Sequence, residues 1–113
     1  FSSKIEDDIL MVSANREKID RVDWITGAVM FFSKTFIKEV GLFDQDNFFM
    51  YGEDQDICLR AWKNNYEVIY NPNGICMHNY ERRGSSLIIS KYSLYQLKST
   101  FKLFWKYKFN LKL

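Results

Sequence analysis

Residues 53–60 have the sequence Glu53-Asp54-Gln55-Asp56-Ile57-Cys58-Leu59-Arg60, the most informative segment of this 113-residue chain. Acidic side chains crowd its first turn, where the positive end of a helix dipole favours them. Apolar residues follow at helical spacing, namely Ile57, Cys58, Ala61 and Trp62. Asp56 and Arg60 stand four residues apart, so they can pair on one helix face. We therefore expect a helix that starts near Glu53 and ends at Asn64-Asn65.

The acidic start of this helix has two interpretations. A carboxylate at a helix start, next to an aromatic loop, can act as a general base whose pKa is raised by neighbouring charges and lowered by the helix dipole. Alternatively, the acids only stabilise the helix N-terminus, and composition alone favours this simpler interpretation. Asp44-Gln45-Asp46 and Asp54-Gln55-Asp56 also suggest cation binding, but neither has the spacing of a calcium loop.

On the N-terminal side of this segment, the pattern predicts a strand and a short helix. Residues 23–32 read as a buried strand, because the second half of this run is apolar on both faces. Gly27 within it indicates close approach of the backbone to another group. Ser33 is a predicted N-cap for a helix that ends at Gly41. An irregular aromatic loop over residues 42–52 then leads into the acidic helix start.

On the C-terminal side, residues 67–70 and 75–78 read as short strands that are joined by a turn at residues 71–74. From about Leu87 the pattern becomes helical. Four lysines fall within about 80° of one another on this helix; they are Lys91, Lys98, Lys102 and Lys106. The rest of its circumference is mostly aromatic and aliphatic, so we expect a C-terminal amphipathic helix.

The basic aromatic segment, residues 91–113, has three interpretations. It could lie on an anionic membrane surface, bind nucleic acid through stacking and phosphate contacts, or pack on the rest of the domain with its lysines facing water. The lysines form one narrow row and arginine is absent from the segment, which argues against nucleic acid as a partner. The membrane interpretation and the packing interpretation both stay open.

Composition bounds the class of protein. A chain of 113 residues with 47% hydrophobic side chains is a single globular domain, and no uninterrupted apolar run is long enough for a transmembrane helix. Residues 1–60 carry a net charge of −5 and residues 61–113 one of +7, which suggests two surfaces with different partners. Cys58 and Cys76 fit neither a disulfide framework nor a zinc site and favour a reduced, cytosolic core. The first residue, Phe1, is not Met, which suggests a fragment.

Two single residues outside the acidic segment also carry potential chemistry. His78 is the chain's one histidine and could serve as a metal ligand or an acid–base group, but one histidine without a partner cannot form a metal site. Trp24, close to Gly27, is either a platform for a substrate or an ordinary buried aromatic side chain.

Several motifs follow one another in a fixed order over residues 20–86. They are Val22-Asp23-Trp24-Ile25-Thr26-Gly27-Ala28, Val40-Gly41-Leu42-Phe43-Asp44, Phe48-Phe49-Met50-Tyr51-Gly52, residues 53–60, Tyr66-Glu67-Val68-Ile69-Tyr70-Asn71-Pro72 and His78. Their order and spacing resemble the C-terminal half of the catalytic domain in family 2 glycosyltransferases, particularly the rhamnosyltransferase-like branch. The resemblance implies an α/β fold, the C-terminal portion of the GT-A nucleotide-diphospho-sugar transferase fold.

The resemblance also implies roles for individual residues. Asp54 would be the catalytic base that deprotonates the acceptor hydroxyl, which then attacks the anomeric carbon of a nucleotide sugar with inversion. The residues on the acceptor side would be Trp24, Gly27, Glu53 and Asp56. His78 would help to hold a divalent cation, Mn²⁺ or Mg²⁺, that neutralises the leaving diphosphate. Asp44-Gln45-Asp46 matches a structural turn of the family and not its metal motif.

The nucleotide-binding half that precedes these motifs in the family is absent from the 113 residues. The resemblance therefore implies that residues 1–86 are the acceptor-side part of the catalytic domain and residues 87–113 a basic aromatic helical tail. We expect the isolated fragment to be inactive, to retain no cation and to self-associate through an exposed sheet edge.

The expected function is sugar transfer from a nucleotide-sugar donor to a saccharide or lipid-linked acceptor, in cell-surface polysaccharide synthesis. The expected location is the cytoplasm, peripherally on the cytoplasmic face of the membrane. The alternative is a non-catalytic membrane-surface or interaction module built on residues 91–113. A third, weaker hypothesis is a small cation-binding domain built on the acidic residues.

Overall fold

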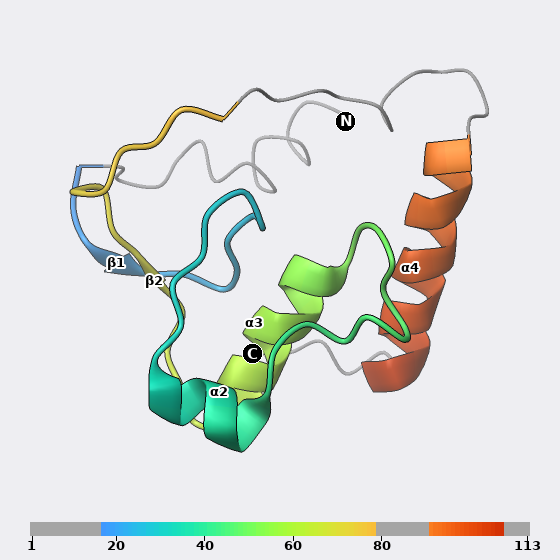
Figure 1. The fold of residues 1–113 in the computed structure, drawn as a ribbon, viewed down its shortest axis with the longest axis horizontal. Helices are drawn as coiled ribbons and strands as arrows, with labels where there is room; N and C mark the ends of the chain where they lie inside the picture. Colours follow the sequence, from blue (N-terminus) through green and yellow to red (C-terminus); the bar gives the residue numbers. More distant parts are fainter. Residues whose placement is uncertain (1–16, 79–90, 108–113) are drawn as a thin grey trace.

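The computed structural model describes residues 17–78 and 91–107. Its two short strands, β1 (Asp20–Arg21) and β2 (Ile69–Tyr70), pair antiparallel. Its helices are α2 (Lys34–Val40), α3 (Glu53–Lys63) and α4 (Lys91–Tyr107). Figure 1 shows α3 between α2 and α4, with the strand pair on the side of the molecule away from α4. The part of the chain that the structure describes is therefore a helical layer with a small two-stranded sheet at one edge.

The predicted boundaries of helix α2 are confirmed, because the residues that start and end it act on their near neighbours in the sequence. The Ser33 hydroxyl oxygen accepts a hydrogen bond from the Phe36 N–H at 3.0 Å, as an N-cap side chain does. At the other end, Gly41 has a φ of 85° and its N–H donates to the Ile37 carbonyl at 3.1 Å. Phe36 is the buried residue of this helix and packs into the core.

Helix α3 begins at Glu53, as predicted, and ends one residue before the predicted Asn64 stop, which is its C-cap. Its start is unusual because Gly52, the N-cap, has a φ of 83° and makes no side-chain capping hydrogen bond. Tyr51 before it also has a positive φ of 66°. The chain therefore turns sharply between the aromatic loop and α3. The first turn of α3 has no side-chain cap, and its three acidic residues lie at the positive end of the helix dipole.

The strand predicted at residues 23–32 is wrong. This segment is irregular, with Phe31 95% exposed and Met30 partly buried. A buried strand needs a neighbour on each side for its backbone hydrogen bonds, and the described residues place none there. The strand predicted at residues 75–78 is wrong for the same reason, and the one predicted at 67–70 shortens to Ile69–Tyr70, paired with β1.

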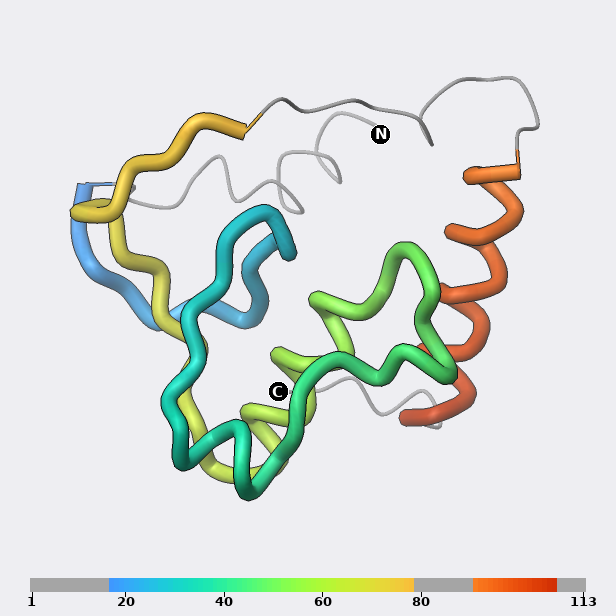
Figure 2. The backbone as a smooth tube through the Cα atoms, in the orientation of Figure 1, coloured from blue at the N-terminus to red at the C-terminus, as the bar shows by residue number. Residues whose placement is uncertain are grey.

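Two groups of buried side chains hold these elements together. The first joins the strand region, α2 and α3, and contains Val22, Phe36, Ile57, Cys58, Ala61 and Val68. The second joins the aromatic loop, α3 and α4, and contains Phe48, Leu59, Leu103 and Tyr107. Figure 2 shows the loop at residues 42–52 passing beside α4 on its way from α2 to α3. Helix α4 therefore shares a core with α3, while the boundary predicted at residue 86 lies outside the described residues.

The orientation of α4 corrects one prediction about its lysines. Lys102 and Lys106 turn towards the loop and α3, where the ammonium group of Lys102 donates to the Asn47 carbonyl at 3.0 Å. The expectation that the packed helix points its lysines to water is therefore wrong for these two residues. Among the helices at residues 17–78 and 91–107, none has the length and hydropathy that a membrane span requires.

Candidate active site

The start of α3 faces the irregular segment that contains Gly27. One carboxylate oxygen of Asp54, Oδ2, accepts a hydrogen bond from the Gly27 N–H at 3.1 Å. The other, Oδ1, accepts from the Gln55 N–H at 2.8 Å. Asp54 is half-buried and Gly27 is exposed, so this carboxylate is held by two backbone groups at the surface. Such a carboxylate has the orientation and access that a general base needs.

Glu53 lies beside Asp54 and is the second carboxylate at this place. A Cβ atom added at Gly27 would lie 3.5 Å from the Cβ of Asp54 and 3.9 Å from Oε1 of Glu53. Burial, followed by the charge of Asp54, raises the pKa of Glu53 against a lowering hydrogen bond from its own backbone. Its Oε2 atom is buried and has no hydrogen-bond partner among the residues that the structure describes. The Glu53 carboxylate therefore lies near Gly27 through Oε1, while its other oxygen has hydrogen-bonding capacity that the described residues leave unused.

Asp56, two residues further on, has a different environment because it points into the protein. It is 0% exposed, and Arg60 donates to its Oδ2 at 2.9 Å. Its Oδ1 accepts from the Tyr107 hydroxyl at 2.7 Å and lies 2.8 Å from the Lys106 ammonium nitrogen. Its three side-chain partners are thus Arg60, Tyr107 and Lys106, and no part of the carboxylate is exposed to solvent. Asp56 therefore has no surface for an acceptor and acts as the centre of a buried ionic cluster.

This cluster, Asp44, Asp56, Arg60, Lys106 and Tyr107, connects four parts of the chain. The Arg60 guanidinium also donates to the carbonyls of Val40 at 2.8 Å and Leu42 at 2.6 Å, at the end of α2. Lys106 reaches the Asp44 carboxylate at 2.7 Å as well as Asp56. Two positive and two negative groups thus neutralise one another around Asp56, the one fully buried charge of the cluster, while the other three are partly exposed.

The electrostatics of the cluster follow from these contacts. The hydrogen bond from Lys106 is the main reason that the pKa of Asp44 falls from 3.8 to about 2, helped by Asn47 and opposed by burial. Burial lowers the pKa of Lys106, but its hydrogen bonds to the two carboxylates outweigh this and raise it. Burial, with the adjacent Asp56 charge, raises the pKa of the Tyr107 hydroxyl. At neutral pH these shifts maintain the Asp44 carboxylate, the Lys106 ammonium group and the neutral Tyr107 phenol.

Two further predicted site residues, Trp24 and His78, are not members of the ionic cluster around Asp56. Trp24 is half-buried and packs against the first core cluster. His78 is exposed, near the end of the first described range. Within residues 17–78 and 91–107, no three His, Cys, Asp or Glu side chains are grouped as a metal ion requires. The donor set of the described residues therefore does not fit the divalent cation that the family resemblance implies.

Sequence reasoning missed the two α4 residues of the cluster, Lys106 and Tyr107. They lie 50 and 51 residues after Asp56, so no local spacing connects them to it. The i,i+4 pair of Asp56 and Arg60 was the one local signal, and the structure confirms it.

A comparison with known families decides the identity of the chain. The family model described as glycosyl transferase family group 2 matches residues 2–107, nearly the whole length. The chain belongs to the family 2 glycosyltransferases. For this member of the family, the match supports a GT-A-like fold. The described part of the chain consists of mixed helix and a small two-stranded sheet.

The family 2 chain is also similar to a curated protein, rhamnosyltransferase WbbL of Escherichia coli (strain K12). The two are 33% identical over 100 residues, which are 81% of this chain and 37% of WbbL. The glycosyltransferase chain therefore spans little more than a third of the length of that relative. No solved structure gives a significant match.

Proposed function

We propose that the chain is the acceptor side of an inverting glycosyltransferase and that Asp54 is its general base. The observation that carries this proposal is the Asp54 carboxylate, half-exposed at the start of α3 and held by the Gly27 and Gln55 N–H groups. Two backbone hydrogen bonds orient the side chain while solvent access leaves room for a hydroxyl. A base needs both properties.

The proposed reaction is a single displacement at the anomeric carbon of a nucleotide sugar. The acceptor hydroxyl transfers its proton to Asp54 as its oxygen attacks that carbon from the face opposite the leaving group. The new carbon–oxygen bond forms, the bond to the diphosphate oxygen breaks, and the nucleoside diphosphate departs with the electron pair. The sugar inverts its configuration, and Asp54 then releases its proton to solvent.

The neighbouring groups support the binding of a saccharide or lipid-linked hydroxyl at this place. Glu53 directly precedes Asp54 and its Oε2 lacks a hydrogen-bond partner among the described residues, while the exposed Gly27 donates its N–H to the Asp54 carboxylate. We propose that Glu53 binds a hydroxyl of the acceptor and that Trp24 contributes an aromatic surface nearby. Asp56 belongs to the buried cluster, so its proposed role is to position α3 and not to contact the acceptor.

The proposal extends to the whole protein by way of the comparison with the rhamnosyltransferase. Because the chain covers 37% of that relative, we propose that further residues supply the nucleotide and cation sites. Cell-surface polysaccharide synthesis is the proposed context, and the isolated 113 residues are expected to be inactive.

Nucleoside diphosphate release by a longer chain that includes the upstream coding region tests the proposal. The assay uses a panel of nucleotide sugars with Mn²⁺ or Mg²⁺ and a saccharide or lipid-linked acceptor. Asp54→Asn keeps the shape of the side chain but removes its basicity, so we expect kcat to fall by about 10²–10⁴-fold. Asp46→Asn, at an exposed position in the same loop–helix region, is the matched control.

Either result of this comparison is informative. Loss of activity in Asp54→Asn with retention in Asp46→Asn supports Asp54 as base. Activity that survives Asp54→Asn keeps the reaction class and assigns the base to another residue. Activity of the isolated 113 residues would contradict the division into donor and acceptor sides.

A further inference from the structure

Helix α4 has a packed face and an opposite, apolar face that no described element covers. Ser99, Leu103 and Tyr107 are buried against the loop and α3. On the other side, large apolar side chains are exposed: Leu94 at 57%, Leu97 at 69%, Phe101 at 66% and Trp105 at 72%. At 100° per residue these four fall within about 80° of one another. We call them the outer face of α4, and a cluster of this kind marks an interaction surface more often than chance exposure does.

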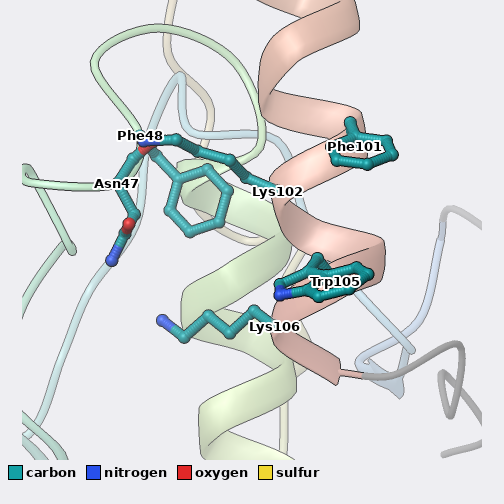
Figure 3. Close-up of a pocket in the computed structure, with 6 residues that line it drawn as sticks. All are labelled: Asn47, Phe48, Phe101, Lys102, Trp105 and Lys106. Atoms are coloured by element: carbon teal, nitrogen blue, oxygen red, sulfur yellow. The ribbon is translucent and has the colours of Figure 1, made fainter.

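Figure 3 shows the two sides of the helix. Lys106 extends from α4 towards α3, whereas Phe101 lies on the opposite side of the helix. The rings of Phe101 and Trp105 stack with centroids 6.3 Å apart. Together with the loop at Asn47 and Phe48, they border a shallow cavity of about 390 Å³ at one margin of the outer face. The aromatic rings are therefore arranged side by side along the helix and are not scattered.

The charges that α4 itself carries are of one sign. Residues 91–107 include four lysines and no acidic residue. Lys102 and Lys106 are bound to the loop and to the buried cluster. Lys91 and Lys98 are exposed, and at helical spacing they border the outer face next to Trp105. The surface is therefore aromatic and aliphatic, with a row of cations along one margin.

We propose that the outer face of α4 docks on an anionic phospholipid surface. Exposed Trp, Phe and Leu rings enter the boundary between headgroups and acyl chains, and lysines along one border bind lipid phosphates. A second copy of the chain fits less well, because two outer faces packed on each other offer the lysines no carboxylate. The charge complementarity therefore selects a membrane as the occupant.

Vesicle co-sedimentation of the full 113-residue chain tests this inference. We expect binding to vesicles of equal parts phosphatidylglycerol and phosphatidylcholine, weak binding to phosphatidylcholine alone, and weakening as salt is added. Lys91→Gln with Lys98→Gln should weaken binding about 25-fold, at about fivefold per charge. Lys34→Gln with Lys38→Gln, which removes the same charge from exposed positions on α2, should leave it unchanged.

The apolar part of the surface has its own pair of variants. Phe101→Ser with Trp105→Ser should weaken vesicle binding by at least about tenfold, because two buried rings are lost from the lipid interface. Phe31→Ser, at a site 95% exposed but away from α4, is the control. Vesicles should also shift the tryptophan emission to shorter wavelength, and Trp105→Phe should abolish that shift while binding is kept. Circular dichroism verifies that each variant is folded.

Three results would overturn the inference. They are equal binding to neutral and anionic vesicles, equal loss in the α2 control, and unchanged binding in the α4 variants. A vesicle-free dimer that Phe101→Ser with Trp105→Ser converts to a monomer would assign the face to a second copy instead. None of these readouts depends on sugar transfer, so the inference and the proposed function stand or fall separately.

Discussion

Asp54 and Asp56 are only two positions apart in the sequence but lie in different environments. Asp54 and Asp56 lie on different faces of α3, because residues two apart on a helix do not face the same way. The first meets solvent and two backbone N–H groups, whereas the second meets Arg60, Lys106 and Tyr107. Their chemistry is therefore set by the direction in which the helix turns each of them. A substitution at one should change catalysis, and a substitution around the other should change stability.

Tyr107→Phe tests whether the partners of the buried Asp56 stabilise the fold. The substitution removes the hydroxyl that donates to the buried Asp56 carboxylate at 2.7 Å and leaves the ring in place. We expect the free energy of unfolding to fall by about 1–3 kcal/mol, because a buried carboxylate loses a hydrogen bond. Urea unfolding measures the change. Tyr95→Phe, on the exposed side of the same helix, is the matched control, and equal shifts in the two variants would refute the assignment.

At the scale of the element, the start of α3 depends on the conformation of Gly52. Its φ of 83° is one that L side chains rarely adopt, and an added Cβ would lie 3.3 Å from the Phe48 ring. We expect Gly52→Ala to destabilise the chain by about 1–2 kcal/mol or more. In Gly74→Ala the new Cβ meets nothing within 4 Å, so its effect should stay within about 0.5 kcal/mol. Comparable unfolding midpoints for the two variants would contradict this account.

The attachment of α4 to the loop should depend on pH through Asp44. Because the folded chain lowers the pKa of this carboxyl from 3.8 to about 2, its stabilising contribution is present above pH 3.8 and is lost as the pH falls towards 2. Asp44→Asn should therefore cost about 1 kcal/mol at neutral pH, allowing for partial solvent screening of the ion pair, and progressively less as the pH falls through 2.

Unfolding by urea at a series of pH values measures this difference. For Asp46→Asn, two residues further along the same loop, the difference in free energy of unfolding from the parent chain should not shrink at low pH. A difference between Asp44→Asn and the parent chain that is constant across the whole range would show that the ion pair with Lys106 does not contribute.

At the scale of the whole molecule, α4 is part of the fold and not an appendage. Removal of residues 91–113 would uncover Phe48, which is 3% exposed, and would leave Asp56 with Arg60 as its one remaining partner. The buried Asp56 carboxylate would lose its hydrogen bond from Tyr107 and its ion pair with Lys106, and loss of the partners of a buried charge is destabilising. We expect the shortened chain to bind a hydrophobic dye and to lose its cooperative unfolding transition. A chain that ends at Tyr107 keeps all of these contacts and serves as the control.

Deletion of α4 would not distinguish loss of a membrane contact from loss of the fold. Deletion of the helix would remove vesicle binding whether or not its outer face touches lipid, since the core would open at the same time. Point substitutions at exposed positions separate the two effects because they leave the buried stripe of α4 intact. Cooperative unfolding of the α4-deleted chain would contradict the shared core at Leu59 and Leu103.

The sequence alone determined the parts of this protein that depend on neighbours along the chain. The Ser33 cap, the Gly41 stop and the acid-rich start of α3 are signals within a few residues, and each element appears where they predict. The ordered motifs over residues 20–86 were also sufficient for the family, which the family match confirms. Sequence alone left two interpretations open for the acidic residues at the start of α3: a general base, or charges that only stabilise the helix N-terminus.

Tertiary structure decided what depends on groups far apart in sequence. A strand forms only beside another strand, so the apolar run at residues 23–32 could not be assigned from its own composition. Lys106 lies between Asp44 and Asp56, although 62 and 50 residues of sequence separate it from them. Which lysines face inward, and hence which aromatic side chains face outward, follows from that contact. The reason is physical, because helical periodicity defines faces but only packing selects the one that is buried.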